Sequence, residues 1–471
     1  MRRPAAALAC AVLLAAAVAT AQRPAISNAV RQFVKTDAPV VALTHVRVID
    51  GTGAPAREDQ TLIIRDGLIA AVGNGVAVPA DAQVIDASGK TVLPGLVMLH
   101  EHLYYPTGPN VYGQLGLSFS RLYLAGGVTT MRTGGNVNGF MDITLAQRAA
   151  GLEIAAPAID ATAPYLNGPQ NQLQMHVLKD PDDARQQVAY WSAMGATSFK
   201  AYMQITKAEL GAAIDEAHRR GLKVTGHLCS VTYAEAAALG IDNLEHGFAA
   251  STDFVAGKQA DTCPGQAVGQ QTIAALDPAS EKFQQLVRTL IDRKVALTST
   301  LTVFETFTPG RPMPPGVDVL MPSLKDQFTQ TYQRTSQNPR STYATLFPRM
   351  MKLEYAFAKA GGLLVAGTDP TGSGGVIPGY SNQRQLELLV EEGFTPVEAI
   401  QIGTLNGAKY LGRDQRIGSI AAGKQADLML VTGDPSRVIA DVRNVDTVFR
   451  QGVGFDPAKL VQSVSGKVGI W

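Results

Sequence analysis

The sequence LPGLVMLHEH at residues 93–102 is the stretch that most clearly indicates how this chain folds. A Pro-Gly turn leads directly into an apolar run, and the run ends on His100 and His102. A short apolar run that begins at a turn is typical of a buried strand. Because residues i and i+2 of a strand point to the same side, both imidazoles can reach one ion. Alone, the pair could also be an ordinary surface feature, so the surrounding pattern has to decide.

Short strands alternate with helices in the part of the chain that follows. Beyond the strand at 96–99, strand candidates lie at 128–132, 155–161, 198–201, 224–228, 243–245, 296–300 and 363–367. Helical patterns fall between them, for example at 180–194, 207–220, 280–294 and 349–360. Eight strands that are each followed by a helix predict an α/β fold, a (β/α)8 TIM-like barrel. A doubly wound open sheet is the rival fold, but it usually has a phosphate-binding glycine turn after an early strand, which this sequence lacks.

Both ends of the chain are rich in short β-type runs. These runs lie at 40–50, 61–65, 68–72 and 82–85 before the barrel, and at 426–431 and 447–451 after it. Because chain termini often lie close together, we predict that both ends form one small β-sandwich domain. The predicted order is a signal peptide at 1–21, a leader at 22–39, a β-domain part at 40–92, a metal-binding barrel at 93–412 and a second β-domain part at 413–471.

Composition and the N-terminus indicate an exported protein. The chain has 471 residues, of which 46% are hydrophobic. Its formal net charge of only +1 argues against nucleic acid as a partner, because phosphate binding needs a basic face. Two arginines, an apolar run at 5–19 and Ala-Thr-Ala at 19–21 predict a cleaved signal peptide. The run is short for the alternative, a membrane anchor. We therefore expect a periplasmic or secreted chain whose mature form needs no membrane. An oxidising compartment permits a disulfide between Cys229 and Cys263, but two cysteines do not require one.

Three further residues follow the C-terminal ends of other predicted strands, the face on which barrel enzymes keep their sites. His227 ends the fifth strand, His246 ends the sixth, and Asp369 ends the eighth. A lone histidine at a strand end is usually structural. Three such residues on three separate strands, all at the same end, favour a shared metal site with the first histidine pair.

Lys200 ends the fourth predicted strand. A lysine that points into a barrel is unfavourable unless its charge is removed or paired. Burial favours the neutral amine, which can take up carbon dioxide and become a carbamate. A carbamate is an anionic ligand with two oxygens, suited to bridging two cations. The alternative is an ion pair of Lys200 with Asp369 or Glu245.

Taken together, these motifs resemble the amidohydrolase superfamily. The resemblance rests on the turn at 93–95, on the histidine pair and on the strand-end residues Lys200, His227, His246 and Asp369. It extends to the sequences IGSI at 417–420 and GKQAD at 423–427, and it covers roughly residues 40–451. It is closest to imidazolonepropionase-like and Xaa-Pro dipeptidase (prolidase)-like members, which include ochratoxin-cleaving amidases. One departure is Met98, where the family commonly has an aspartate that supports the metal ligands.

The resemblance implies a binuclear hydrolase that cleaves a C–N amide bond. The implied ligands are His100, His102 and Asp369 for one ion, His227 and His246 for the other, and N6-carboxylated Lys200 as the bridge. Imidazole-rich sites favour Zn²⁺, so two divalent ions are the expected cofactors, with zinc as the first choice and manganese or cobalt as the alternatives. Water activated by the ions is the implied nucleophile, and Asp369 is the implied carrier of its proton to the leaving nitrogen.

Substrate contacts are harder to assign from the sequence. His176 lies among amide side chains after the third strand, and we expect it to act as a catalytic or oxyanion contact, the alternative being a surface loop residue. Tyr165 and Tyr202 follow the third and fourth strands and are predicted to line the pocket. His45 and His218 are predicted to be structural. Long insertions at 249–276 and 303–339 are expected on the face that holds the site.

The resemblance leaves the substrate open. A dipeptide or an N-acyl amino acid is the first choice, and its carboxylate would need a cation. The candidate cations are Arg311, Lys325, Arg334 and Arg340. The alternatives are a hydrolase of cyclic amides or lactones, and a non-enzymatic solute-binding barrel. Any of these is compatible with a homo-oligomer.

Overall fold

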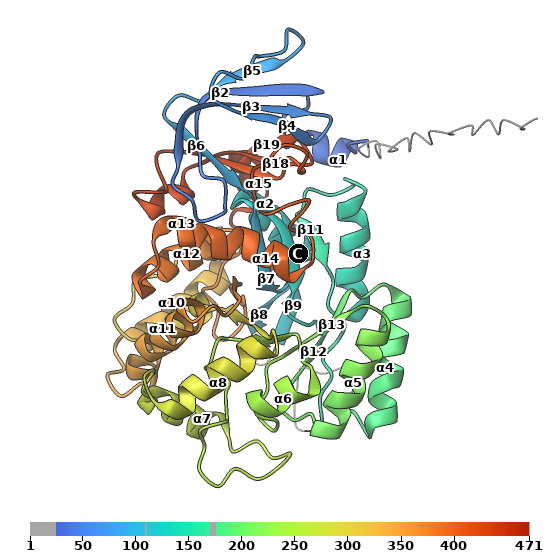
Figure 1. The fold of residues 1–471 in the computed structure, drawn as a ribbon, viewed down its shortest axis with the longest axis vertical. Coiled ribbons are helices and arrows are strands. Elements are labelled where there is room, and N and C mark those ends of the chain that lie inside the picture. Colours follow the sequence, from blue (N-terminus) through green and yellow to red (C-terminus); the bar gives the residue numbers. More distant parts are fainter. Residues whose placement is uncertain (1–24, 109–110, 170–175, 471) are drawn as a thin grey trace, which may run out of the picture.

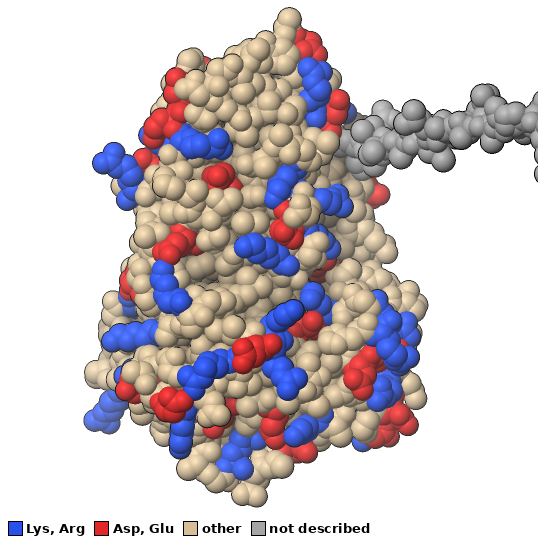
Figure 2. All heavy atoms as spheres, in the orientation of Figure 1, with Lys and Arg blue, Asp and Glu red and all other residues tan. Residues whose placement is uncertain are grey.

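A computed structural model describes residues 25–108, 111–169 and 176–470, and shows a mixed α/β protein (Figure 1). The predicted signal peptide at 1–21 lies outside the described residues. Within the described ranges, no helix has both the length and the apolar character needed to cross a bilayer. Figure 2 shows lysine and arginine side chains interspersed with aspartate and glutamate, so that neither sign dominates this face.

Eight parallel strands form the centre of the molecule, and they lie close to the eight predicted ranges. They are β7 (Leu96–Glu101), β10 (Val128–Thr133), β11 (Ala158–Asp160), β12 (Ser198–Ala201), β13 (Lys223–Gly226), β14 (Asn243–Glu245), β15 (Ala296–Ser299) and β16 (Leu364–Ala366). They pair in two sheets, with the orders β11-β10-β7 and β12-β13-β14-β15-β16. Nearly all of their residues are buried, as is usual for parallel strands covered on both faces.

Backbone contacts connect the two parallel sheets at both of their edges. A parallel bridge joins Thr162, just after β11, to Ser198 at the start of β12. At the other edge, the amides of Thr368 and Asp369 after β16 donate to the carbonyl of His100 in β7. Closure of all eight strands into one barrel stays a prediction, as does the division into domains at residues 92 and 412.

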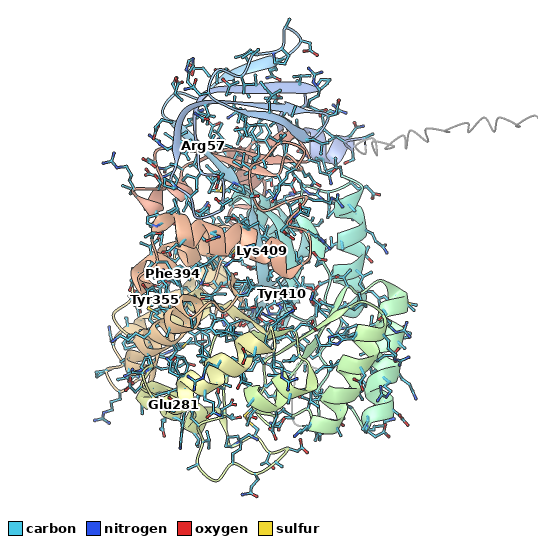
Figure 3. All side chains as sticks on the ribbon, viewed as in Figure 1. Arg57, Glu281, Tyr355, Phe394, Lys409 and Tyr410 are labelled. Carbon is cyan, nitrogen blue, oxygen red and sulfur yellow. A yellow bond between two sulfur atoms is a disulfide. The ribbon has the colours of Figure 1, made fainter. Side chains whose placement is uncertain are left out.

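Helices lie between successive strands, and α4, α5 and α6 begin at polar capping residues. Those between the parallel strands are α2 (Gly116–Ala125), α3 (Gly139–Ala150), α4 (Pro181–Met194), α5 (Lys207–Arg219), α6 (Tyr233–Leu239), α8 (Glu281–Asp292) and α11 (Tyr343–Lys359). At the start of α5, the side chain of Thr206 accepts a hydrogen bond from the backbone amide of Glu209. The carboxylate of Glu209 in turn accepts a hydrogen bond from the backbone amide of Thr206. This pair of bonds satisfies helix-end amides that would otherwise lack partners. After β16 the chain continues into α12 (Tyr380–Glu392), α13 (Pro396–Gln401) and α14 (Gly407–Tyr410). Figure 3 shows side chains filling the space between these helices; the rings of Tyr355 and Phe394 lie 5.0 Å apart there.

The two ends of the chain meet in one nine-stranded sheet, which Figure 1 shows as blue and red strands side by side. Its order is β1-β19-β18-β17-β6-β2-β3-β4, with β5 beside β2. The N-terminal strands are β1 (Val34–Thr36), β2 (Val40–Val48), β3 (Arg57–Arg65), β4 (Leu68–Gly73), β5 (Gln83–Asp86) and β6 (Lys90–Pro94), and the C-terminal ones are β17 (Leu428–Thr432), β18 (Val445–Arg450) and β19 (Val453–Phe455). The predicted meeting of the ends is therefore present, whereas their arrangement as a two-layered sandwich stays a prediction.

Both long insertions contain helices of their own. The first holds α7 (Gln266–Ala275), and the second follows α9 (Leu301–Glu305) and holds α10 (Pro322–Ser336). A disulfide joins Cys229, which follows β13, to Cys263 in the first insertion, with their Cα atoms 4.8 Å apart. The crosslink that the sequence left open thus ties the insertion that carries α7 to the end of a central strand.

Candidate functional site

The six predicted metal ligands come together at the C-terminal ends of the parallel strands. The candidate ligand cluster consists of His100 and His102 from β7 and the turn after it, Lys200 from β12, His227 after β13, His246 after β14 and Asp369 after β16. Two of its members have a left-handed backbone, with φ of 66° at His246 and 57° at Asp369. Residues other than glycine rarely adopt this conformation, and it is concentrated at functional sites.

His100, His102 and Asp369 form a compact group that could hold a metal ion. Their nearest ligand atoms lie within 4.8 Å of one another, and all three side chains are buried. His102 Nε2 lies 3.2 Å from Asp369 Oδ1, and His100 Nε2 lies 3.8 Å from the same oxygen. Burial lowers the pKa of His102 to about 4, which favours the neutral ring that a metal requires.

The outer nitrogens of the first two histidines are held by other groups, so that Nε2 of each ring faces the cluster. His100 Nδ1 lies 2.7 Å from Glu245 Oε2, and His102 Nδ1 lies 3.1 Å from the carbonyl of Gly135. Close packing adds to this, because a Cβ atom at Gly367 would overlap the Cβ of His100. Glu245, Gly135 and Gly367 therefore hold the two rings in place, although Met98 stands where the family commonly has a supporting aspartate.

Glu245 is the central support of this arrangement, and the sequence did not single it out for that role. Arg132 Nη2 donates to Glu245 Oε1 at 2.7 Å, and the guanidinium lies over the ring of Tyr410, which Figure 3 labels. Burial opposes ionisation of Glu245, but the neighbouring His100 and Arg132 hold its pKa well below the usual range. A buried carboxylate kept ionised in this way orients the imidazole and raises its basicity as a ligand.

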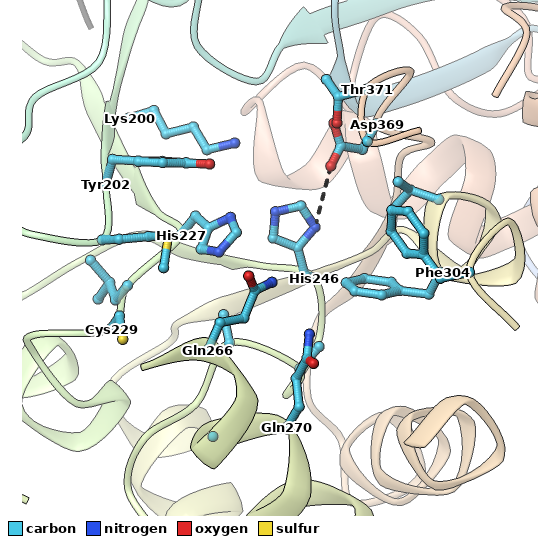
Figure 4. Close-up of a pocket in the computed structure, with 18 of the residues that line it drawn as sticks. Lys200, Tyr202, His227, Cys229, His246, Gln266, Gln270, Phe304, Asp369 and Thr371 are labelled. Carbon is cyan, nitrogen blue, oxygen red and sulfur yellow. Dashed lines mark hydrogen bonds and ion pairs between the residues drawn. The ribbon is translucent and has the colours of Figure 1, made fainter. Parts of the chain in front are cut away.

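Lys200 points into the cluster rather than to solvent (Figure 4). Its Nζ lies 3.1 Å from His100 Nε2, and the side chain is 1% exposed. Burial lowers the pKa of Lys200 to about 8. Among the described residues, no carboxylate lies within 4.0 Å of its Nζ, so the predicted alternative, an ion pair with Asp369 or Glu245, is not formed.

His227 and His246 lie beside the compact group rather than within it. Their ring centroids are 4.5 Å apart, and the ring of His246 lies 4.6 Å from that of His100. His246 Nδ1 lies 2.8 Å from Thr300 Oγ1 and 3.8 Å from Asp369 Oδ2, and Figure 4 marks the contact with Asp369 by a dashed line. Burial lowers the pKa of His227 to about 3, so both members of this pair are neutral.

A cavity of about 220 Å³ opens onto the cluster. Tyr165 and Tyr202 both line it, with ring centroids 4.8 Å apart, and the hydroxyl oxygens of Tyr165 and Tyr104 are 2.6 Å apart. The opposite side, which we call the pocket wall, comes from the insertions and from α11. The pocket wall consists of Gln266 and Gln270 on α7, Phe304 on α9, Phe307 just after it, and Tyr343 on α11. Sequence reasoning placed the insertions on this face but named none of these side chains.

Three other histidines are not brought into the pocket. His176 Nε2 lies 2.7 Å from Asp183 Oδ2 at the start of α4, and His176 is not among the lining residues. Its expected role as a catalytic or substrate contact therefore receives no support from the geometry. His45 pairs with Asp59, and His218 pairs with Asp242.

Comparison with known proteins relates one part of the chain to a family. Residues 338–454 match the model of the Amidohydrolase family. An enamidase from Eubacterium barkeri is 39% identical over 85 residues, which are 18% of this chain and 22% of that protein. The match thus spans only about a fifth of the relative's length.

Solved structures match over most of the chain. A Xaa-Pro dipeptidase with methionine in its active site has a TM-score of 0.66 and 20% identity, covering 88% of this chain and 100% of that one. Ochratoxinase from A. niger has a TM-score of 0.64 and 17% identity, covering 92% of this chain and 100% of that one. At these identities the likeness shows a common fold. Residues 338–454 therefore resemble the Amidohydrolase family, and the chain shares its fold with a Xaa-Pro dipeptidase and with ochratoxinase.

Proposed function

We propose that this protein is a metal-dependent hydrolase that cleaves a C–N amide bond with the help of two divalent ions. The observation that carries the proposal is the convergence of six side chains from five separate strand ends, five of which line one cavity. Four imidazoles, one carboxylate and one buried amine form a donor set that suits Zn²⁺. His100, His102 and Asp369 would hold one ion, and His227 and His246 would hold the other.

Lys200 is proposed to bridge the two ions after carboxylation of its amine. Its Nζ lies against His100, is shielded from solvent and has no carboxylate partner within ion-pair distance among the described residues. An uncompensated ammonium in such a place is unfavourable, whereas a carbamate would be compensated by cations. The bound ions would supply the positive charge that acidifies a water molecule and polarises the scissile carbonyl.

The side chains around the cluster would position the reactants and move the proton. Asp369 lies at the edge of the cavity, and its carboxylate would take the proton of the attacking water and deliver it to the leaving nitrogen. The tyrosines at positions 104, 165 and 202 would keep the substrate in place and exclude water.

Export is proposed as well. The N-terminal sequence has the three parts of a signal peptide, and the disulfide between Cys229 and Cys263 suits an oxidising compartment. We take dipeptides and N-acyl amino acids as the first substrate classes, with cyclic amides and lactones as the alternative. The two predicted β-rich ends are proposed to form a separate small domain.

Replacement of Lys200 tests the proposal directly. Lys200→Ala should abolish hydrolysis across a panel of dipeptides, N-acyl amino acids, cyclic amides and lactones, and short carboxylic acids should restore part of it by occupying the vacated bridge. Lys282→Ala, at an exposed site on α8, serves as the matched control. Unchanged turnover in Lys200→Ala would contradict the bridge. A purified chain with neither bound transition metal nor hydrolytic activity would favour a solute-binding barrel instead.

A further inference from the structure

The pocket wall is aromatic next to the candidate ligand cluster. The ring of Phe304 lies 5.8 Å from that of His246, and Tyr343 extends the surface, with its ring 6.2 Å from Phe304 and 5.2 Å from Phe307. Flat apolar rings at these spacings offer a partner an aromatic surface to pack against. A substrate bound at the cluster would therefore have an aromatic surface within reach of its acyl or amine portion.

Two glutamine side chains on α7 complete this wall, and they differ in their hydrogen bonding. Gln270 Nε2 donates to the hydroxyl of Tyr343 at 2.8 Å, so this amide is already engaged. Gln266 is exposed to the cavity, and Figure 4 shows its amide on the side of His227 and His246. Among the described residues it has no hydrogen-bond partner, so its donor and acceptor are both available to a ligand.

The described lining of the cavity contains no arginine, and Lys200 is its only lysine. The four cations expected to receive a substrate carboxylate lie elsewhere. Arg311 is paired with Glu305 and Glu391, and Lys325 is paired with Asp318. Arg334 and Arg340 are not among the lining residues. The two internal gaps, at 109–110 and 170–175, contain no lysine or arginine in the sequence.

We propose that the preferred substrates are amides with an aromatic portion and no free carboxylate, and that Gln266 recognises an uncharged polar group on them. The inference rests on the proposed function, but it replaces the dipeptides and N-acyl amino acids taken there as first substrate classes, which carry a free carboxylate, with neutral amides. A carboxylate in this cavity would lack a side-chain cation, and an unpaired buried charge is strongly disfavoured. It would instead compete with the scissile carbonyl for the metal centre. A primary carboxamide, by contrast, can satisfy both groups of the Gln266 amide.

Binding of non-cleavable ketones separates this preference from catalysis. In 4-oxo-5-phenylpentanamide a methylene replaces the scissile nitrogen of phenylacetylglycinamide, and 4-oxo-5-phenylpentanoate is the matching carboxylate. Isothermal titration of the metal-loaded chain should give a Kd for the carboxamide that is lower by about tenfold or more than that of the carboxylate, in line with the penalty for an unpaired charge. 4-Oxopentanamide, which lacks the phenyl ring, should also bind about tenfold more weakly than the phenyl carboxamide.

A charge introduced at position 266 should reverse the preference. Gln266→Lys should bind the phenyl carboxylate more tightly than the phenyl carboxamide. Gln271→Lys, at an exposed position five residues further along α7, should keep the parent order. The inference is overturned if the parent chain binds the carboxylate at least as tightly as the carboxamide, if the carboxamide does not bind, or if the two lysine variants behave alike.

The same ligands distinguish failure of this inference from failure of the proposed function. A chain that hydrolyses amides but prefers the carboxylate ketone is a hydrolase with a different substrate class. A chain that binds the carboxamide ketone with the expected order but hydrolyses neither phenylacetylglycinamide nor the rest of the panel keeps the pocket preference and loses the hydrolase proposal.

Discussion

The two sides of the cavity are built in different ways. The candidate ligand cluster stands on the ends of buried parallel strands, and three of its four imidazoles are held by a second group, namely Glu245, the carbonyl of Gly135 and Thr300. The pocket wall stands on insertions, includes the exposed Gln266 and is tied down by a disulfide at Cys263. From this difference we expect the candidate ligand cluster to determine which reaction occurs, and the pocket wall to determine which substrate is bound. Perturbing one side at a time tests this division.

Removal of metal should have the largest effect. Chelation should abolish hydrolysis of every substrate, because water in the cavity would lose the charge that activates it. Readdition of Zn²⁺ should restore turnover, with the metal content followed by mass spectrometry. Turnover that persists in a chain free of metal would contradict the proposed role of the cluster.

Loss of the Glu245 carboxylate should have the next largest effect. Glu245→Gln should lower metal affinity by about 10- to 100-fold, because His100 would lose the anion that orients it. The activity that the variant retains should show the same order of substrate preference as the parent. Glu281→Gln, at the exposed residue labelled in Figure 3, is the control and should bind metal like the parent. A change in substrate preference without a change in metal affinity would show that Glu245 acts in substrate selection and not in metal binding.

Opening the disulfide should affect the wall alone. The crosslink closes a sequence separation of 34 residues, so its loss in the Cys229→Ser, Cys263→Ser double variant should reduce the free energy of unfolding by about 4 kcal/mol. A mobile α7 should raise KM while metal content stays at the parent level. Denaturant unfolding and metal analysis of the same preparation check both parts. Equal losses of metal and substrate binding would show that the two sides are not independent.

Removal of one hydroxyl from the wall should have the smallest effect. Tyr343→Phe keeps the aromatic surface but leaves the Gln270 amide without its partner, a change worth about 1 kcal/mol. KM for aromatic amides should rise severalfold while kcat stays unchanged. A fall in kcat with an unchanged KM would mean that Tyr343 acts on the reacting bond instead.

Strand-end residues could be predicted because a regular pattern placed them. The alternation of short apolar runs with helical segments put Lys200, His227 and His246 at equivalent ends of neighbouring strands. His176 had no such pattern behind it, and it lies with Asp183 outside the cavity lining. The side chains of the wall could not be predicted either, since a long insertion carries no periodicity that fixes which residue faces inward.

The sequence by itself determined the strand and helix order, the parallel arrangement of the eight central strands and the candidate ligands that their ends bring together. It could do so because hydrophobic periodicity and turn residues act locally along the chain. Only the tertiary structure decided that Glu245 and Arg132 hold His100 in place, that Cys229 meets Cys263, and that Gln266 faces the cavity. These contacts join segments far apart in the sequence, and such contacts depend on how the folded elements pack.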